Sequence, residues 1–375
     1  MGQSPAKPIP ILLASSLKPV KDVRAWQKLG RSLHETNTYS LNIIGFSAKM
    51  LQQEAGVNFF SSKSSFHSKW ERVISQLHFI RLLIQIRPGI LICCTYEYLP
   101  VAAIFKNWLN YRLVYDVQEN YVANLDLNPT LTSKAKERMT RFIQKSESKK
   151  GIDLYLFAEK CYAEEMPEKK PFLVLENKYS GLIKPVKPLR FPLRIGYKFV
   201  ITGTITPAFG ILDAVLWFKS VLEEFPESKL KIIGHLTLTE FGEKLSQVCL
   251  NVPEIELSFS EIPVSHGQII EAMKGADFAL LPYQNLPAIK DKMPTKLFEA
   301  AALGVPVLIT PNEKWENFFR PFSGGFPVDF SNGQEAGIQF SKALFQEYFT
   351  AQPDDSIHWN SQKSDFLKAI EDLLS

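Results

Sequence analysis

Short apolar strands alternate with helical segments along most of this 375-residue chain. The strand-like runs are continuously apolar, which is typical of parallel strands covered by helices on both faces of a sheet. The strands expected on this pattern are residues 10–14, 39–46, 90–95, 112–117, 153–157, 198–202, 229–233, 255–259, 278–281 and 305–309. The chain is therefore predicted to be an α/β protein built on doubly wound parallel sheets.

A segment rich in proline and basic residues interrupts this alternation at residues 176–192, which read ENKYSGLIKPVKPLRFP. Such a composition is typical of an interdomain linker. Because the alternation restarts afterwards, we expect two doubly wound, Rossmann-like domains, residues 1–180 and 181–358, facing each other across a cleft. Residues 359–375 carry apolar side chains at helical spacing and are predicted to form a terminal helix.

Between the strands, apolar residues recur at the three- and four-residue spacing of helices. In the segment 69–86 this spacing places seven side chains on one face: Trp70, Val73, Ile74, Leu77, Ile80, Leu83 and Ile84. The other helices expected are residues 22–33, 99–109, 211–225, 238–250, 265–275 and 294–303.

The charge is divided unevenly between the two halves. Residues 1–180 contain 25 Lys and Arg against 16 Asp and Glu, whereas residues 181–375 contain 18 against 23. The halves are therefore expected to meet different partners. No apolar run is long enough for a membrane helix, which needs about 18 residues, and no signal peptide is expected. Neither a metal-binding motif nor a phosphate-binding P-loop is present, so no metal site is predicted.

The densest group of polar residues surrounds the predicted start of a helix at residues 290–299, KDKMPTKLFE. Unsatisfied N–H groups at a helix N-terminus favour a phosphate, and the lysines at 290, 292 and 296 add positive charge. The carboxylates of Asp291 and Glu299 suit vicinal hydroxyl groups of a sugar or ribose. An ordinary surface helix with solvated lysines remains the alternative from these residues alone.

The stretch PTKLFEAAALGVPVLIT resembles the donor-site helix of GT-B glycosyltransferases, specifically the retaining family 4 type. That family carries two carboxylates eight residues apart, a spacing that Asp291 and Glu299 reproduce. The resemblance implies that Glu299 binds the ribose of a nucleotide-sugar, and that Asp291 contacts the donor sugar. Lys290, Lys292, Thr295 and Lys296 would then lie at the donor diphosphate.

Two further stretches agree with this resemblance. Residues 114–121, VYDVQENY, are similar to a strand and loop with the pattern Tyr-Asp-x-His-Glu, in which the histidine faces the donor sugar. Here Gln118 takes the place of the histidine, and Glu119 follows it. Residues 202–214, TGTITPAFGILDA, resemble the glycine-containing turn that approaches the diphosphate, which implies a role for Gly203 and Thr204. The closing WNSQKSDFLKAIEDLL is similar to the family's terminal helix, which returns to the N-terminal domain.

The resemblance implies a hexosyltransferase-type enzyme of polysaccharide biosynthesis that moves a sugar, with retention and without metal, to a glycan or lipid-linked acceptor. The nucleotide-sugar would be its substrate, and no cofactor is expected. A nucleotide-sugar epimerase and a non-catalytic GT-B binding protein remain alternatives. We expect a cytoplasmic protein and no nucleic-acid partner. Basic residues from Lys134 to Lys150 along a helical stretch suggest peripheral contact with the inner face of the membrane; a solvated helix is the alternative.

Overall fold

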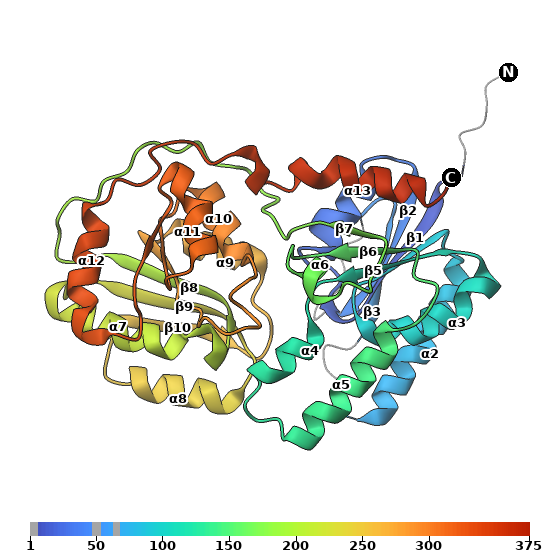
Figure 1. Cartoon of the computed structure of the whole chain (residues 1–375), viewed down its shortest axis with the longest axis horizontal. Coiled ribbons are helices and arrows are strands. Elements are labelled where there is room, and N and C mark those ends of the chain that lie inside the picture. The colour runs from blue at the N-terminus through green and yellow to red at the C-terminus, as the bar shows by residue number, and fades with distance from the viewer. Residues whose placement is uncertain (1–6, 47–53, 63–67) are drawn as a thin grey trace. The chain divides into compact units, whose positions relative to one another are not determined.

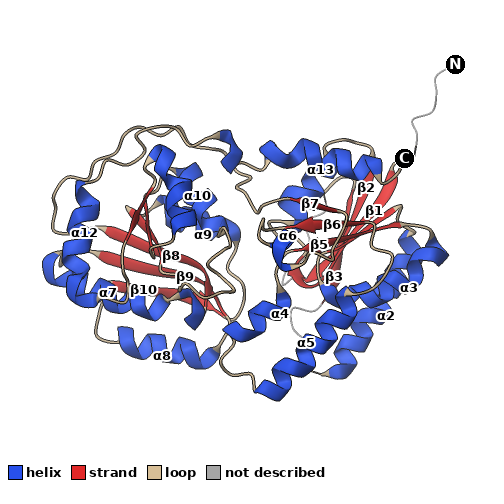
Figure 2. Ribbon diagram, in the orientation of Figure 1, coloured by secondary structure: helices blue, strands red, loops and turns tan. Residues whose placement is uncertain are grey.

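The computed structural model describes residues 7–46, 54–62 and 68–375, and the chain divides into two compact units (Figure 1). Unit 1 comprises residues 1–180 together with residues 359–375, and unit 2 comprises residues 181–358. Each unit contains one parallel β-sheet covered by helices, as Figure 2 shows. The predicted α/β class with doubly wound sheets is confirmed.

The sheet of unit 1 has seven strands in the order β3-β2-β1-β4-β5-β6-β7, and every pairing between them is parallel. The order reverses beside β1, so the connecting helices cover both faces. The strands are β1 (Ile9–Pro19), β2 (Tyr39–Phe46), β3 (Val57–Ser62), β4 (Ile90–Cys93), β5 (Arg112–Val117), β6 (Leu154–Phe157) and β7 (Phe172–Val174).

The helices of unit 1 pack on the two faces of this sheet and enclose a separate apolar core on each face. They are α1 (Arg31–His34), α2 (Lys69–Ile86), α3 (Leu99–Leu109), α4 (Tyr121–Asn124), α5 (Ser133–Glu147), α6 (Tyr162–Glu165) and α13 (Asn360–Asp372). The expected helix over residues 22–33 is a π-helix at Ala25–Gly30 that continues into α1.

The terminal helix α13 belongs to the core that contains Trp26 and Leu33. Phe366 and Ile370 are fully buried there. At the start of the helix, the indole N–H of Trp359 donates to the Ser32 hydroxyl over 2.8 Å. The last residues of the chain therefore complete unit 1.

Unit 2 has a six-stranded sheet in the order β10-β9-β8-β11-β12-β13, again with parallel pairings. Its strands are β8 (Lys198–Ile205), β9 (Lys229–Leu236), β10 (Ile255–Ser260), β11 (Phe278–Leu281), β12 (Val307–Ile309) and β13 (Gly325–Pro327). Its helices are α7 (Ile211–Glu224), α8 (Thr239–Cys249), α9 (His266–Lys274), α10 (Thr295–Leu303), α11 (Glu313–Phe319) and α12 (Ala336–Phe345). Strands β8, β9 and β11 therefore end at the same edge of the sheet, where ligands bind in such folds.

The structure differs from the sequence analysis at α2. It turns Phe79, Leu82 and Leu83 toward the sheet, whereas most of the predicted apolar face, including Trp70 and Leu77, is exposed. Both faces of α2 carry apolar residues, so their spacing alone does not decide which face is buried.

Candidate functional site

The carboxyl edge of the unit 2 sheet brings Gly203 and Lys296 together. Gly203, near the end of strand β8, has a φ of +106°, a conformation that glycine adopts readily and other residues avoid. A Cβ atom at this position would lie 3.0 Å from Cε of Lys296. The lysine side chain therefore runs directly over the glycine backbone, and the end of β8 meets the first turn of α10.

Helix α10 positions both Lys296 and Glu299. Its sequence, TKLFEAAAL, is rich in strong helix formers, and the helix ends at Gly304, whose φ is +67°. It begins at Thr295 directly after Pro294, and no side chain caps it. The Leu297 N–H donates to the Pro294 carbonyl, so the N–H groups of Thr295 and Lys296 are the donors that the first turn offers to an anion.

Glu299 is the most enclosed of the predicted site residues, with only 1% of its surface exposed. Lys296 Nζ lies 3.2 Å from its Oε2 atom, and His266 Nε2 lies 2.8 Å from its Oε1 atom. A buried carboxylate requires such partners, because an isolated charge in the interior is costly. The two basic groups hold the carboxylate in one orientation at the sheet edge.

An aromatic pair lies beside this carboxylate. The rings of Phe209 and Tyr283 are stacked with centroids 4.3 Å apart, and they follow strands β8 and β11. Burial, and after it the negative charge of Glu299, raises the pKa of the Tyr283 hydroxyl above its ordinary value. Tyr283 therefore remains neutral at this edge and presents a flat apolar ring with a polar tip.

Hydrogen bonds to its backbone carbonyl groups hold the loop before α10 in place. The N-terminal residues of α11 hold it: Asn312 Nδ2 donates to the Lys290 carbonyl over 3.0 Å, and Trp315 Nε1 donates to the Lys292 carbonyl over 2.8 Å. Lys314 Nζ donates to the Asp291 carbonyl. The side chains of Lys290 and Asp291 are exposed, whereas that of Lys292 is half-buried.

In unit 1, Gln118 and Glu119 follow β5, and a buried ion pair positions Gln118. Asp116 is fully buried and binds Arg24, whose Nη2 atom lies 2.7 Å from Oδ1 of the carboxylate. Gln118 Nε2 donates to the other carboxylate oxygen over 2.8 Å. This chain of contacts fixes the amide of Gln118 at the carboxyl end of the sheet.

Glu119 has two partners of its own. Its carboxylate accepts from Asn124 Nδ2 over 2.8 Å and lies 3.4 Å from Lys18 Nζ. The Glu119 charge raises the pKa of Lys18, although burial of the lysine acts in the opposite direction. Gln118 and Glu119 thus occupy a polar, charge-balanced loop.

Residues 215–330 match the family model described as glycosyl transferase-like. No curated protein matches the sequence. Among solved structures, sucrose-phosphate synthase from Thermosynechococcus elongatus is similar at a TM-score of 0.68 and 10% identity, over 97% of this chain and 99% of that one.

Two other solved structures agree. HepE from Anabaena, in complex with UDP-glucose, has a TM-score of 0.65 at 11% identity, over 97% of this chain and 100% of that one. An α,α-trehalose-phosphate synthase (UDP-forming) from Burkholderia vietnamiensis has a TM-score of 0.64 at 9% identity, over 98% and 99%. The chain has a GT-B fold. The resemblance to GT-B glycosyltransferases found in the sequence is thus confirmed.

The segment that matches the glycosyl transferase-like family model contains His266, Asp291 and Glu299. Of the predicted donor-site residues, the structure brings together Gly203, Lys296 and Glu299, with Thr295 at the start of the same helix. Asp291 and Lys290 lie on the exposed loop, and Thr204 is an exposed residue of β8. It stays a prediction that these residues form one site together with Gln118 and Glu119 of unit 1.

The sequence analysis missed His266, Tyr283 and the Arg24–Asp116 pair. His266 follows Ser265, whose hydroxyl forms a capping box with Gln268 at the start of α9. That motif reveals the helix start but not the contact with a carboxylate 33 residues away. Asp116 lies within the VYDVQENY motif, yet nothing local points to Arg24, 92 residues earlier.

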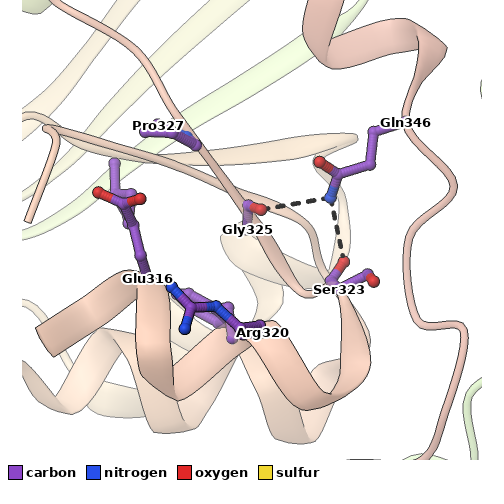
Figure 3. A pocket seen from close by; sticks show the side chains of 8 residues that line it. Glu316, Arg320, Ser323, Gly325, Pro327 and Gln346 are labelled. Atoms are coloured by element: carbon purple, nitrogen blue, oxygen red, sulfur yellow. Dashed lines mark hydrogen bonds between the residues drawn. The ribbon is translucent and has the colours of Figure 1, made fainter. Parts of the chain in front are cut away.

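A cavity of about 230 Å³ lies elsewhere in unit 2, near the ends of β12 and β13. Gln346 Nε2 points into it and donates to the carbonyl groups of Gly325 and Ser323, as Figure 3 shows. Glu316 and Arg320 line another side of it. None of the predicted site residues lines this cavity, so it is separate from the group around Glu299.

Among the described residues, no three His, Cys, Asp or Glu side chains are grouped so that they could hold a metal ion. Within the same residues, no helix has both the length and the apolar character required to cross a membrane.

Proposed function

We propose that this GT-B protein is a glycosyltransferase that moves a sugar from a nucleotide-sugar donor to a glycan or lipid-linked acceptor. The observation that carries the proposal is the buried Glu299 carboxylate, held by Lys296 and His266 at the carboxyl edge of the unit 2 sheet. This group lies within the segment that matches the glycosyl transferase-like family. The donor half of the reaction is therefore proposed for unit 2.

The geometry around Glu299 suits a nucleoside diphosphate sugar. A carboxylate with a fixed orientation accepts hydrogen bonds from the two vicinal hydroxyls of a ribose. Lys296 and the uncapped N-terminus of α10 provide positive charge and N–H donors for the diphosphate. The neighbouring Phe209 and Tyr283 rings offer an apolar surface for a planar base.

In the proposed chemistry, the anomeric carbon exchanges its bond to the diphosphate for a bond to an acceptor hydroxyl oxygen, and the hydroxyl proton leaves with the diphosphate. Negative charge develops on the departing phosphate oxygen. Lys296 and the first turn of α10 would stabilise that charge, in the role that a metal ion has in other transferases. Lys290 and Lys292 would join them if the loop before α10 closes on the donor, and Asp291 would then contact the hydroxyl groups of the donor sugar. Retention of configuration and a hexose donor are proposed from the resemblance alone.

Unit 1 is proposed to receive the acceptor. Its Gln118 and Glu119 lie on a polar loop at the carboxyl edge of that sheet, and its charge is strongly positive. A phosphate-containing acceptor, such as a lipid-linked glycan, suits that charge. We also propose a cytoplasmic location with peripheral contact to the inner face of the membrane through the basic helix α5, and a role in polysaccharide biosynthesis.

The donor site is tested by Glu299→Gln, which removes the charge and keeps the size of the side chain. We expect the affinity for UDP-glucose, or for the sugar nucleotide that binds best in a panel, to fall about 10- to 100-fold, as loss of a charged hydrogen bond implies. Isothermal titration calorimetry measures this. Glu243→Gln, on the exposed side of α8, is the matched control. Unchanged affinity in Glu299→Gln would contradict the assignment.

Product analysis separates the alternatives. A nucleotide-sugar epimerase would change the donor without any added acceptor, whereas a transferase would leave the donor sugar unchanged apart from slow hydrolysis. A non-catalytic GT-B protein would bind a nucleotide or glycan and release no nucleotide. Incubating the chain with a bound donor, and following both the sugar and the free nucleotide by NMR, distinguishes the three outcomes.

A further inference from the structure

Helix α2 of unit 1 carries a second apolar face that nothing described in the unit covers. Its buried face is formed by Phe79, Leu82 and Leu83. The opposite face exposes large apolar side chains, in fractions from 40% to 77%: Trp70, Val73, Ile74, Leu77 and Ile84. Trp70 and Ile84 are separated by about 21 Å along the helix axis at 1.5 Å per residue. The exposed face therefore extends along nearly the whole helix.

The neighbouring helices continue this apolar surface. Helix α2 contacts α3, and α3 contacts α5, so the three helices lie side by side over one face of the sheet (Figure 1). On α3, Ile104 is 73% exposed and Trp108 is 65% exposed. On α5, Met139 and Phe142 are exposed. We call the outward residues of these three helices the α2–α3–α5 surface.

Positive charge accompanies the apolar residues on the same helices. The three helix sequences contain nine Lys and Arg but only three Glu. Arg81 is exposed on the outward face of α2, four positions after Leu77, and Lys134, Arg138, Arg141 and Lys145 are exposed on α5. Of the glutamates, Glu137 pairs with Arg141, and Glu147 is turned inward to Tyr115 and Lys169. The α2–α3–α5 surface is thus both apolar and cationic.

We infer that the α2–α3–α5 surface docks unit 1 onto a bilayer of anionic lipids. Exposed Trp, Ile, Leu and Phe side chains enter the interface between headgroups and acyl chains, and Arg and Lys contact the lipid phosphates. A folded protein partner would bury the apolar residues but leave most of this positive charge unmatched unless it were itself strongly acidic. Large exposed apolar patches on soluble chains are uncommon and mark such contact sites.

The inference deepens the proposed membrane contact and rests on the proposed function only for the nature of the acceptor. Binding to lipid is measured without donor or acceptor, so its failure would leave the donor-site proposal intact. Failure of nucleotide binding would likewise leave the lipid measurement valid. The inference adds helices α2 and α3 to α5 as the elements in contact with the bilayer.

The first experiment is flotation of the full chain with vesicles of phosphatidylcholine alone or of phosphatidylcholine and phosphatidylglycerol at 3:1. We expect at least about 10-fold stronger partitioning into the anionic vesicles at low salt, and a loss of that preference at high salt, where charges are screened within about 3 Å. A chain that stays unbound with anionic vesicles at low salt would overturn the inference.

The tryptophans allow the contact surface to be located directly. Trp70 and Trp108 are exposed, whereas the other four, Trp26, Trp217, Trp315 and Trp359, are at most 3% exposed. Lipids brominated on the acyl chain should therefore quench only the fluorescence of Trp70 and Trp108. The Trp70→Phe/Trp108→Phe variant should still float with the vesicles but lose the quenching. Quenching that persists in this variant would place the contact elsewhere and overturn the inference.

Variants test the apolar and the cationic parts separately. Trp70→Ser/Trp108→Ser and Arg81→Gln/Arg138→Gln should each lower partitioning at least about 10-fold, because interfacial aromatic residues and surface charges both contribute to binding. Leu250→Ser/Phe345→Ser removes equally exposed apolar side chains from unit 2, 79% and 75% exposed, and should leave it unchanged. Sedimentation that shows a dimer abolished by the tryptophan variant would make a second copy the occupant and overturn the inference.

Discussion

His266 Nε2 lies 2.8 Å from Oε1 of Glu299, although the two residues are separated by 33 positions in the chain. The contact joins the first turn of α9 to the first turns of α10. Because Lys296 approaches the other oxygen, both oxygens of the carboxylate have a basic neighbour before any donor binds. Preorganisation of this kind lowers the cost of orienting the carboxylate toward a ligand.

Replacement of His266 tests this preorganisation. In His266→Ala, Glu299 loses one of the two side chains that hold it. The affinity for the nucleotide donor should fall about 5- to 20-fold, less than in Glu299→Gln, because the carboxylate itself remains. His266→Gln can still donate to Oε1 and should retain more of the affinity. Calorimetry measures both, with Lys274→Ala at the exposed end of α9 as the control. Equal affinities in all three variants would show that the contact has no part in binding.

Lys290 and Lys296 are both predicted to lie at the donor diphosphate, but their surroundings in the structure differ. Lys296 lies over Gly203 and beside Glu299, whereas Lys290 is on the exposed loop. We expect Lys296→Met to lower the affinity for UDP at least about 10-fold, and Lys290→Met to lower it by less than about 2-fold, because exposed charges are screened. Binding of UDP and of uridine, compared in each variant, reports whether the loss belongs to the phosphates. Equal losses in the two variants would mean that the loop before α10 closes over the donor.

The positions of most strands along the chain were predictable, because apolar runs such as residues 112–117 are short and bounded by polar residues or turns. Strands β3, β7 and β13 were missed, since VNFFSS contains polar residues and FLV and GFP have only three residues each, and all three lie at sheet edges. The orientation of α2 was not predictable, because Phe79 and Trp70 lie on two faces of similar apolar character. Periodicity identifies a helix but does not choose between two apolar faces.

The candidate site was predictable where its residues are close in sequence. Lys296 and Glu299 are three positions apart on one helix, so their contact follows from helix geometry. Contacts that depend on the fold were not predictable: His266 reaches Glu299 only because α9 packs beside α10, and Arg24 reaches Asp116 across 92 residues. Asp291 shares the predicted spacing with Glu299, yet it lies on an exposed loop, because the turn at Pro294 separates it from the buried helix.

Gly203→Ala tests the close approach of β8 and α10. The new methyl group would require a strained backbone at φ +106° and would displace Lys296 by contact with its Cε atom. We expect the free energy of unfolding to fall by about 1 to 3 kcal/mol, the usual cost of such strain, and donor affinity to fall with it. Gly267→Ala is the control, because no atom lies within 4 Å of its added Cβ in α9. Chemical denaturation and calorimetry measure the two effects. A Gly203→Ala variant as stable as the control would contradict the close approach of Gly203 and Lys296.

The buried pair of Arg24 and Asp116 provides a test of unit 1. Asp116→Asn leaves the Arg24 charge without its carboxylate in a site where both residues are at most 2% exposed, so the free energy of unfolding should fall by about 3 to 5 kcal/mol. Gln118 loses the fixed charge that orients its amide, so any transfer activity should fall more than donor affinity, which belongs to unit 2. The exposed pair Lys231–Glu256 is the control, because Glu256→Gln should change stability by less than about 1 kcal/mol. If donor affinity and transfer activity fall by the same factor in Asp116→Asn, Gln118 has no separate role in the transfer step.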